Sequence, residues 1–153
     1  SMERILDEID YAEKIMKSIN DCLADFEDVE VWAEPGRYIC GSAVNVITSI
    51  IGKQMRDEKQ WYYIDDGIYG SFSGILFDHW DYDIISLKDE DNTYEKATIA
   101  GPSCDSLDIV KKEMYCPKLD EGDLLIALNA GAYSKVSATT FNGFSLPKTV
   151  ALE

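Results

Sequence analysis

The run Glu34-Pro35-Gly36-Arg37 places a carboxylate three residues before an arginine, with a glycine between them. Glycine lets the backbone approach a ligand closely, and the planar guanidinium of Arg37 matches the oxygens of a phosphate group. The carboxylate of Glu34 could keep a ring nitrogen protonated. A surface turn with a Glu–Arg pair explains the same residues, so this motif alone is a weak indication of phosphate binding.

A second segment, Gly101 to Asp108, joins a Gly-Pro turn to a cysteine and an aspartate, Cys104 and Asp105. A thiol on such a turn could act as an acid, and the carboxylate beside it could bind a cation. A structural turn with a buried cysteine is the commoner explanation of such residues when they stand alone.

Three shorter motifs also have a purely structural alternative. Asp78-His79 ends an apolar run and is equally consistent with an ordinary pair at a strand edge. Gly131-Ala132-Tyr133 is consistent with a glycine turn and a packing tyrosine, and Phe141-Asn142-Gly143-Phe144 with a hairpin turn between core aromatics. Each motif is weak alone, whereas their order and spacing together are informative.

The composition restricts the class of protein. The 153 residues are 46% hydrophobic, which suits one compact domain with a core. The net charge of −15 repels phosphate backbones and anionic lipids, so we expect no nucleic-acid or membrane partner. No apolar stretch approaches the roughly 20 residues of a membrane span, and no signal peptide follows Ser1-Met2, which resembles a tag remnant. We therefore expect a cytoplasmic protein.

Metal sites are also disfavoured. The four cysteines, at positions 22, 40, 104 and 116, are widely spaced and form no CxxC pair, so neither a zinc site nor a disulfide framework is indicated. His79 is the only histidine, which argues against a hydrolytic metalloenzyme with several histidine ligands. We expect no metal.

The first part of the chain is typical of an α/β layer. Apolar residues recur every three or four positions over residues 3–26, which predicts an amphipathic helix. The alternation of residues 29–33 predicts a short strand that ends at the Pro-Gly turn. A lone unit of this kind cannot cover both faces of a parallel strand, so these residues indicate a fragment of a larger domain.

The remainder of the chain predicts many short strands separated by turn residues, as in an antiparallel β-sandwich or barrel. The acidic run Asp89 to Asn92 predicts a solvated loop. The expected strands, rich in β-branched and aromatic residues, are 44–51, 61–64, 73–77, 83–87, 96–100, 124–128 and 149–152.

Six motifs in this order resemble the C-terminal part of the eukaryotic ornithine decarboxylases, in the alanine-racemase-like group of decarboxylases that depend on pyridoxal 5′-phosphate (PLP). The related diaminopimelate decarboxylases share fewer of them, because they normally have Glu-Ser after the cysteine and lack the Phe-Asn-Gly-Phe segment. The motifs are Ala33 to Tyr38, Asp66 to Phe72, Phe77-Asp78-His79, Gly101 to Asp108, Gly131-Ala132-Tyr133 and Thr140 to Phe144.

The resemblance implies roles for the cofactor-binding residues. Glu34 would pair with the protonated pyridine nitrogen of PLP, which strengthens the ring as an electron acceptor. Gly36, Arg37 and Tyr133 would bind the phosphate through a backbone N–H, a guanidinium and a hydroxyl. Phe77 stands where the family usually has tyrosine, which removes one hydroxyl at the edge of the pocket.

The resemblance also implies roles around the substrate. Asp78 and Asp105 would bind the distal ammonium of ornithine, and Cys104 would protonate the α-carbon after CO₂ leaves. Phe141 would line the substrate pocket. In this family the active site lies at a head-to-tail homodimer interface, where the loop bearing Cys104 and Asp105 reaches into the partner's site. An antizyme-type regulator is a further partner that the resemblance suggests.

The resemblance predicts a mostly β fold in two parts. Residues 1–43 would be the last helix-strand unit of a truncated PLP-binding (β/α)₈ barrel, and residues 44–153 a C-terminal antiparallel β-sandwich or barrel. Such a barrel takes about 250 residues and carries the Schiff-base lysine, so we expect this chain alone to be inactive and not to bind PLP.

Two alternatives remain open for the function. One is a non-catalytic homologue that acts by binding other proteins, as antizyme inhibitors do; the retained cofactor and substrate residues argue against it. The other is a related decarboxylase of lysine, arginine or diaminopimelate. The two aspartates would repel the distal carboxylate of diaminopimelate, whereas lysine differs from ornithine by one methylene, which the sequence does not resolve.

Overall fold

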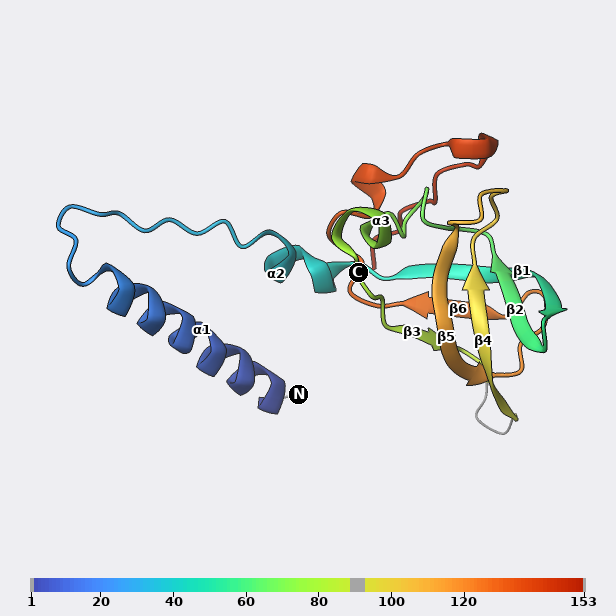
Figure 1. Cartoon of the computed structure of the whole chain (residues 1–153), viewed down its shortest axis with the longest axis horizontal. Helices are drawn as coiled ribbons and strands as arrows, with labels where there is room; N and C mark the ends of the chain where they lie inside the picture. The colour runs from blue at the N-terminus through green and yellow to red at the C-terminus, as the bar shows by residue number, and fades with distance from the viewer. Residues whose placement is uncertain (1, 89–92, 153) are drawn as a thin grey trace. The chain divides into compact units, whose positions relative to one another are not determined.

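The computed structural model describes residues 2–88 and 93–152 (Figure 1). The predicted loop Asp89 to Asn92 lies outside the described residues. The chain divides into two compact units, Ser1–Glu34 and Pro35–Glu153, and each is described by itself. The prediction that residues 1–43 are the remnant of a barrel stays a prediction.

The first unit consists of helix α1 (Met2–Leu23) and an irregular segment after it. This helix confirms the predicted one, except that it ends at Leu23, where a turn begins with a bond from the Phe26 N–H to the Leu23 carbonyl. The strand predicted at residues 29–33 is wrong, because these residues have no regular structure. A strand needs a neighbour for its backbone N–H and C=O groups, and none of the described strands pairs with this segment.

The second unit begins with helix α2 (Gly36–Cys40) and the 3₁₀ turn η1 (Gly41–Ala43), and continues as one six-stranded sheet. The strand order is β3-β6-β1-β2-β4-β5, and the outer strands β3 and β5 also touch, so the sheet is a nearly closed barrel (Figure 1). The strands are β1 (Val46–Arg56), β2 (Lys59–Ile64), β3 (Ile84–Ser86), β4 (Tyr94–Ala100), β5 (Ile109–Pro117) and β6 (Leu124–Ala127).

The predicted mostly β, barrel-like class is confirmed, with one difference in strand direction. Four of the five strand pairs are antiparallel, but β2 and β4 run parallel, with Tyr63 opposite Ala100. The hairpin between β1 and β2 turns at Asp57 and Glu58, both with positive φ (48° and 60°), which suits the right-handed twist of the flanking strands.

The core lies inside the curled sheet. In strand β1, alternate residues point inward: Thr48 and Ile50 are buried whereas Ile47 and Ile51 are exposed. This alternation follows from the two-residue period of a strand. The largest fully buried side chains are Tyr62, Tyr82, Phe72, Ile50, Ile64, Ile68, Ile99, Leu119 and Leu125.

Five of the predicted strands have a counterpart in the sheet, but strand β5 was not predicted. Its centre, Lys111-Lys112-Glu113, is charged and conceals the apolar alternation. Val110, Met114 and Cys116 are buried on the inner face of β5. The three charged residues lie between Val110 and Met114, where the pairing of β5 with β4 has register shifts.

Two further predicted strands are wrong. Of residues 73–77, all but Ser73 lie in a short helix, α3 (Gly74–Asp78). A short apolar run does not distinguish a strand from a helix segment. Gly74 allows this helix to pack closely, since a Cβ there would lie 2.7 Å from the Tyr82 hydroxyl. Residues 149–152 form no strand, and Val150 and Leu152 are exposed. Before them come two 3₁₀ turns, η2 (Lys135–Ser137) and η3 (Phe141–Gly143).

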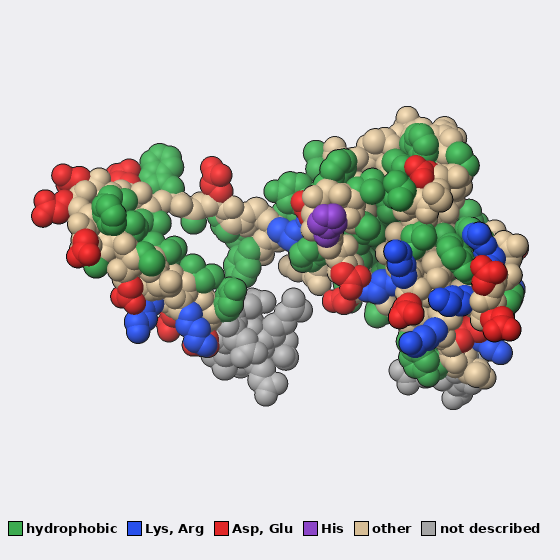
Figure 2. Space-filling view, in the orientation of Figure 1, with side chains coloured by type: hydrophobic (Ala, Val, Ile, Leu, Met, Phe, Trp, Pro, Cys, Tyr) green, Lys and Arg blue, Asp and Glu red, His purple; other side chains and the backbone are tan. Residues whose placement is uncertain are grey.

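The surface of the second unit mixes both signs of charge, as the face in Figure 2 shows. Asp120 binds Lys53 and Lys88 at 2.6 and 2.9 Å, and these ammonium groups lower the pKa of its carboxyl to about 2. No described helix has the length and apolar character needed to span a membrane.

Truncating the inner face should cost far more stability than truncating the outer face. Ile64→Ala, at a fully buried position of β2, should lower the free energy of unfolding by about 2–5 kcal/mol, because it leaves a cavity. Ile47→Ala, on the outer face of β1 and 64% exposed, should cost about 1 kcal/mol or less. Urea unfolding followed by near-ultraviolet circular dichroism measures both; equal losses would contradict the described inside and outside of the sheet.

Candidate functional site

The first group of candidate residues surrounds Arg37. Its Nη2 donates to Asp78 Oδ2 at 2.9 Å, so an ion pair joins helix α2 to the end of helix α3. The Arg37 side chain is 21% exposed, and its Nη1 is buried without a hydrogen-bond partner among the described residues. A buried guanidinium nitrogen without an acceptor is costly, so this atom is a ready donor for an anionic ligand.

Two aromatic rings cover the same guanidinium. The Arg37 Cζ lies 4.0 Å from the centre of the Trp80 ring and 5.3 Å from that of Tyr133, both within the range of cation–π attraction. Gly36 lies at the same corner, since a Cβ there would be in ordinary contact with the Tyr133 hydroxyl, at 3.6 Å. The Gly36 backbone, the Arg37 guanidinium and the Tyr133 hydroxyl therefore form one set of donors.

Tyr133 is held in an unusual backbone conformation, with φ at +53°. Its carbonyl accepts hydrogen bonds from the hydroxyls of Ser73 and Ser137 at 3.1 and 3.0 Å. The preceding Gly131 packs directly on the end of α2, since a Cβ there would lie 1.7 Å from the Cys40 carbonyl oxygen. Only glycine fits at that position, which explains why the motif begins with one.

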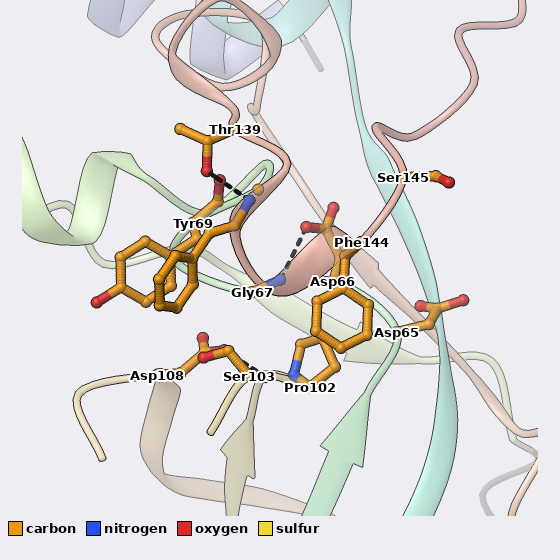
Figure 3. Close-up of a pocket in the computed structure, with 12 residues that line it drawn as sticks. Asp65, Asp66, Gly67, Tyr69, Pro102, Ser103, Asp108, Thr139, Phe144 and Ser145 are labelled. Atoms are coloured by element: carbon orange, nitrogen blue, oxygen red, sulfur yellow. Dashed lines mark hydrogen bonds between the residues drawn. The ribbon is translucent and has the colours of Figure 1, made fainter. Parts of the chain in front are cut away.

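The second group lies on the loop between β4 and β5. Asp108 is buried, and one of its carboxylate oxygens accepts the N–H group of Ile68 at 2.9 Å. The other accepts the N–H group of Ser103 at 3.0 Å, and Figure 3 shows these two residues beside each other. A Cβ at Gly67 or Gly101 would lie within 2.4 Å of this carboxylate, so both glycines are required for the close fit. Asp108 thus fixes the loop on the turn that follows β2.

Asp105 is fixed at the tip of this loop. Its carboxylate accepts the Leu107 N–H at 2.9 Å and the Tyr69 hydroxyl at 2.5 Å. The Leu107 N–H and then the Tyr69 hydroxyl lower the pKa of the Asp105 carboxyl, so it stays charged and suited to a cation. The same carboxylate raises the pKa of the Tyr69 phenol, which therefore remains a donor.

Cys104 and Phe141 belong to the same group. The exposed thiol of Cys104 lies 3.6 Å from Asn142 Oδ1, which also accepts the Cys104 N–H at 3.4 Å. The ring of Phe141 lies 4.3 Å from that of Tyr69, between centroids. The pocket beside these rings, shown in Figure 3, has a volume of about 20 Å³, which is far too small for an amino acid.

The structure therefore brings the predicted residues together in two sets. Gly36, Arg37, Asp78 and Tyr133 form one, and Cys104, Asp105 and Phe141 form the other. No hydrogen bond, ion pair or aromatic contact of the described residues joins them. Glu34 is the last residue of the first unit, so its role at a ring nitrogen stays a prediction.

Sequence reasoning gave no role to three residues that support these sets. Trp80 stacks on Arg37, Tyr69 binds Asp105, and Asp108 closes the loop. Tyr69 and Asp108 lie inside motifs that the sequence analysis had singled out. For Trp80, the one available signal was its position two residues after Asp78 in the sequence. Within residues 2–88 and 93–152, no group of three or more His, Cys, Asp or Glu side chains could hold a metal ion.

Comparison with known proteins gives a consistent result along most of the chain. A family model described as "Pyridoxal-dependent decarboxylase, C-terminal sheet domain" matches residues 19–131. A lysine/ornithine decarboxylase from Selenomonas ruminantium is 46% identical over 128 residues, covering 84% of this chain and 32% of that protein. An ornithine decarboxylase from Panagrellus redivivus is 40% identical over 137 residues, covering 80% and 32%.

Solved structures match in shape as well as sequence. The lysine/ornithine decarboxylase of Vibrio vulnificus complexed with cadaverine has a TM-score of 0.78 and 43% identity, covering 88% of this chain and 37% of that one. The arginine decarboxylase of Paramecium bursaria Chlorella virus bound to agmatine has a TM-score of 0.73 and 35% identity, covering 82% and 36%. The chain thus spans about a third of the length of these relatives.

Removing the charge of Asp108 should loosen the loop between β4 and β5, which carries Cys104. In Asp108→Asn, the amide –NH₂ would face a backbone N–H where a carboxylate oxygen now accepts, leaving a buried donor unpaired at a cost of about 1–3 kcal/mol. Amide hydrogen exchange at Ile68 and Ser103 should accelerate, and the free energy of unfolding in urea should fall. Asp81→Asn, which breaks only the exposed pair with Lys111, is the control and should cost less than about 1 kcal/mol.

Removing the Tyr69 hydroxyl should raise the pKa of Asp105. The hydroxyl stabilises the charged carboxylate, so Tyr69→Phe removes a group that lowers this pKa, whereas the Leu107 N–H remains. A titration of the Asp105 carboxyl carbon by NMR measures the change. Tyr115→Phe, on the outer face of β5, should leave the titration unaltered, and an equally unaltered curve for Tyr69→Phe would refute the role of this bond.

Proposed function

Because the chain belongs to the pyridoxal-dependent decarboxylases, we propose that it forms the C-terminal part of an enzyme that decarboxylates a basic amino acid. The substrate we favour is L-ornithine, which would yield putrescine and CO₂ in polyamine biosynthesis. The observation that carries the proposal is the donor set at Arg37, where Nη1 is buried and unpartnered beside the Gly36 backbone and the Tyr133 hydroxyl.

These donors fit the phosphate of PLP. Arg37 offers Nη1 while Nη2 stays on Asp78, so one guanidinium can serve an anion and a carboxylate together. Glu34 would sit at the pyridine nitrogen. When bound, PLP accepts the electron pair that the departing CO₂ leaves behind, which no side chain of this protein could do.

The carboxylates account for the choice of a diamine-forming substrate. Asp78 keeps a second oxygen for an ammonium group, and Asp105 is held charged by Leu107 and Tyr69. Two carboxylates around one distal ammonium favour a basic side chain and repel the distal carboxylate of diaminopimelate. Cys104, on the loop fixed by Asp108, would deliver a proton to the α-carbon, and Phe141 would line the pocket beside it.

The separation of the two residue sets supports a shared active site. In the proposed head-to-tail homodimer, Gly36, Arg37, Asp78 and Tyr133 serve the site of their own subunit. The loop bearing Cys104 and Asp105 serves the site of the partner. This arrangement gives a function to two sets of polar residues that make no contact with each other among the described parts of one chain.

Lysine and arginine are the alternative substrates within this proposal. The lysine/ornithine decarboxylase of Vibrio vulnificus has been seen with both cadaverine and putrescine, and the viral arginine decarboxylase with agmatine. A non-catalytic homologue of the antizyme-inhibitor type is a second candidate function. The intact donor set at Arg37 and the charged Asp105 favour the enzyme, because a non-catalytic protein has no use for either.

Release of CO₂ tests the proposal. The 153-residue chain with PLP and L-ornithine should be silent, because the resemblance assigns the Schiff-base lysine to the barrel. A chimera with the preceding two thirds of the Vibrio vulnificus enzyme should release CO₂ from ornithine, and Cys104→Ala should slow it about 10²–10⁴-fold. Turnover by the chain alone, or an inactive chimera that binds PLP, would overturn the proposal; faster turnover of lysine or arginine would reassign the substrate.

A further inference from the structure

We propose that Trp80 is a positioning residue for Arg37: its indole ring holds the guanidinium so that Nη1 faces an anionic group. The inference rests on the proposed function, in which that anion is the phosphate of the cofactor. Trp80 belongs to none of the motifs quoted for the family, and it lies two residues after Asp78, where helix α3 has ended.

The contacts of the guanidinium leave its Nη1 without an acceptor. Trp80 covers it at 4.0 Å and Tyr133 approaches at 5.3 Å, while Asp78 occupies Nη2. Tryptophan is the strongest of the aromatic residues in cation–π attraction, and a partly buried cation gains more from it than an exposed one. Among the described residues, Nη1 is thus the buried guanidinium nitrogen of this cluster that lacks an acceptor.

Trp80 is itself anchored, so it can position another group. Its backbone N–H donates to the Gly74 carbonyl at 3.0 Å, across the end of helix α3. A Cβ at Gly74 would lie 3.5 Å from the Trp80 Cβ, and the side chain packs against the core cluster of the sheet. His79, with φ at +52°, reverses the chain between Asp78 and Trp80. The end of helix α3 and the two residues after it thus bring both the carboxylate and the indole to Arg37.

The indole of Trp80 restrains the orientation of the Arg37 guanidinium relative to Asp78. Asp78 attracts the guanidinium, and without a second contact Arg37 could turn to offer both of its terminal nitrogens to that carboxylate. Stacking on a fixed ring restrains the guanidinium plane, so Nη1 stays away from Asp78 and free for the anion. Holding a donor in place before the ligand arrives raises affinity by lowering the ordering cost of binding.

The chain contains a matched control for this contact. Arg56 stacks on Trp61 with its Cζ 4.6 Å from the ring, far from the residues of either set in sequence and with no role in the proposed function. We would compare Trp80→Leu, Trp80→Phe and Trp61→Leu in the full chain. Modification of Arg37 and Arg56 by phenylglyoxal, with and without inorganic phosphate, is followed by mass spectrometry.

In the wild-type chain, phosphate should slow the modification of Arg37 but not that of Arg56. Trp80→Leu should speed the modification of Arg37 about fivefold and abolish the protection by phosphate, with Trp80→Phe between the two. Trp61→Leu should speed the modification of Arg56 and leave that of Arg37 unchanged. This graded loss, confined to Arg37, is a readout that general loosening of the fold would not produce.

The remaining outcomes separate the two proposals. Equal protection by phosphate in the wild type and in both Trp80 variants would overturn the role of Trp80 and leave the phosphate site intact. Absence of protection in the wild type would overturn the phosphate role of Arg37, and the inference about Trp80 with it. If Trp80→Leu speeds the modification of Arg37 and Arg56 alike, Trp80 contributes to the stability of the fold, and its role in positioning Arg37 is refuted.

Discussion

The parallel pairing of β2 with β4 is the constraint on which the second set of site residues depends. Parallel neighbours end at the same edge of a sheet, so the turn after Ile64 and the loop after Ala100 start side by side. A single buried carboxylate, that of Asp108, then closes one on the other through two backbone N–H groups. These two hydrogen bonds position the loop that carries Cys104 and Asp105.

The first set depends instead on helix α3, a helix of five residues whose two ends contact different residues of the set. Its beginning binds the Tyr133 carbonyl through Ser73, and its end carries Asp78 to Arg37. Because Tyr133 and Arg37 come from distant parts of the chain, the ordering of one helix fixes all three. A helix this short has little stability of its own, so its core contacts through Phe72 and Tyr82 matter.

Much of this could be predicted from the sequence, and the failures have physical causes. The glycine motifs correctly marked positions of close packing, since a Cβ at Gly101 would clash with the Asp108 carboxylate and one at Gly131 with the Cys40 carbonyl oxygen. Periodicity failed for α3, whose apolar run is too short to show a period, and for β5, whose centre is charged. The stacking of Trp80 on Arg37 depends on a chain reversal at His79, which local sequence patterns do not reveal.

The strand order also has a consequence for how the protein is made. Strand β1 pairs at once with β2, its neighbour along the chain, but its other edge pairs with β6, where Val46 lies opposite Ala127. Contacts so distant in sequence form late and slow the search for the native state. During synthesis, β1 therefore keeps one edge unpaired until the residues of β6 have emerged, and an unpaired strand edge is prone to pair with another chain.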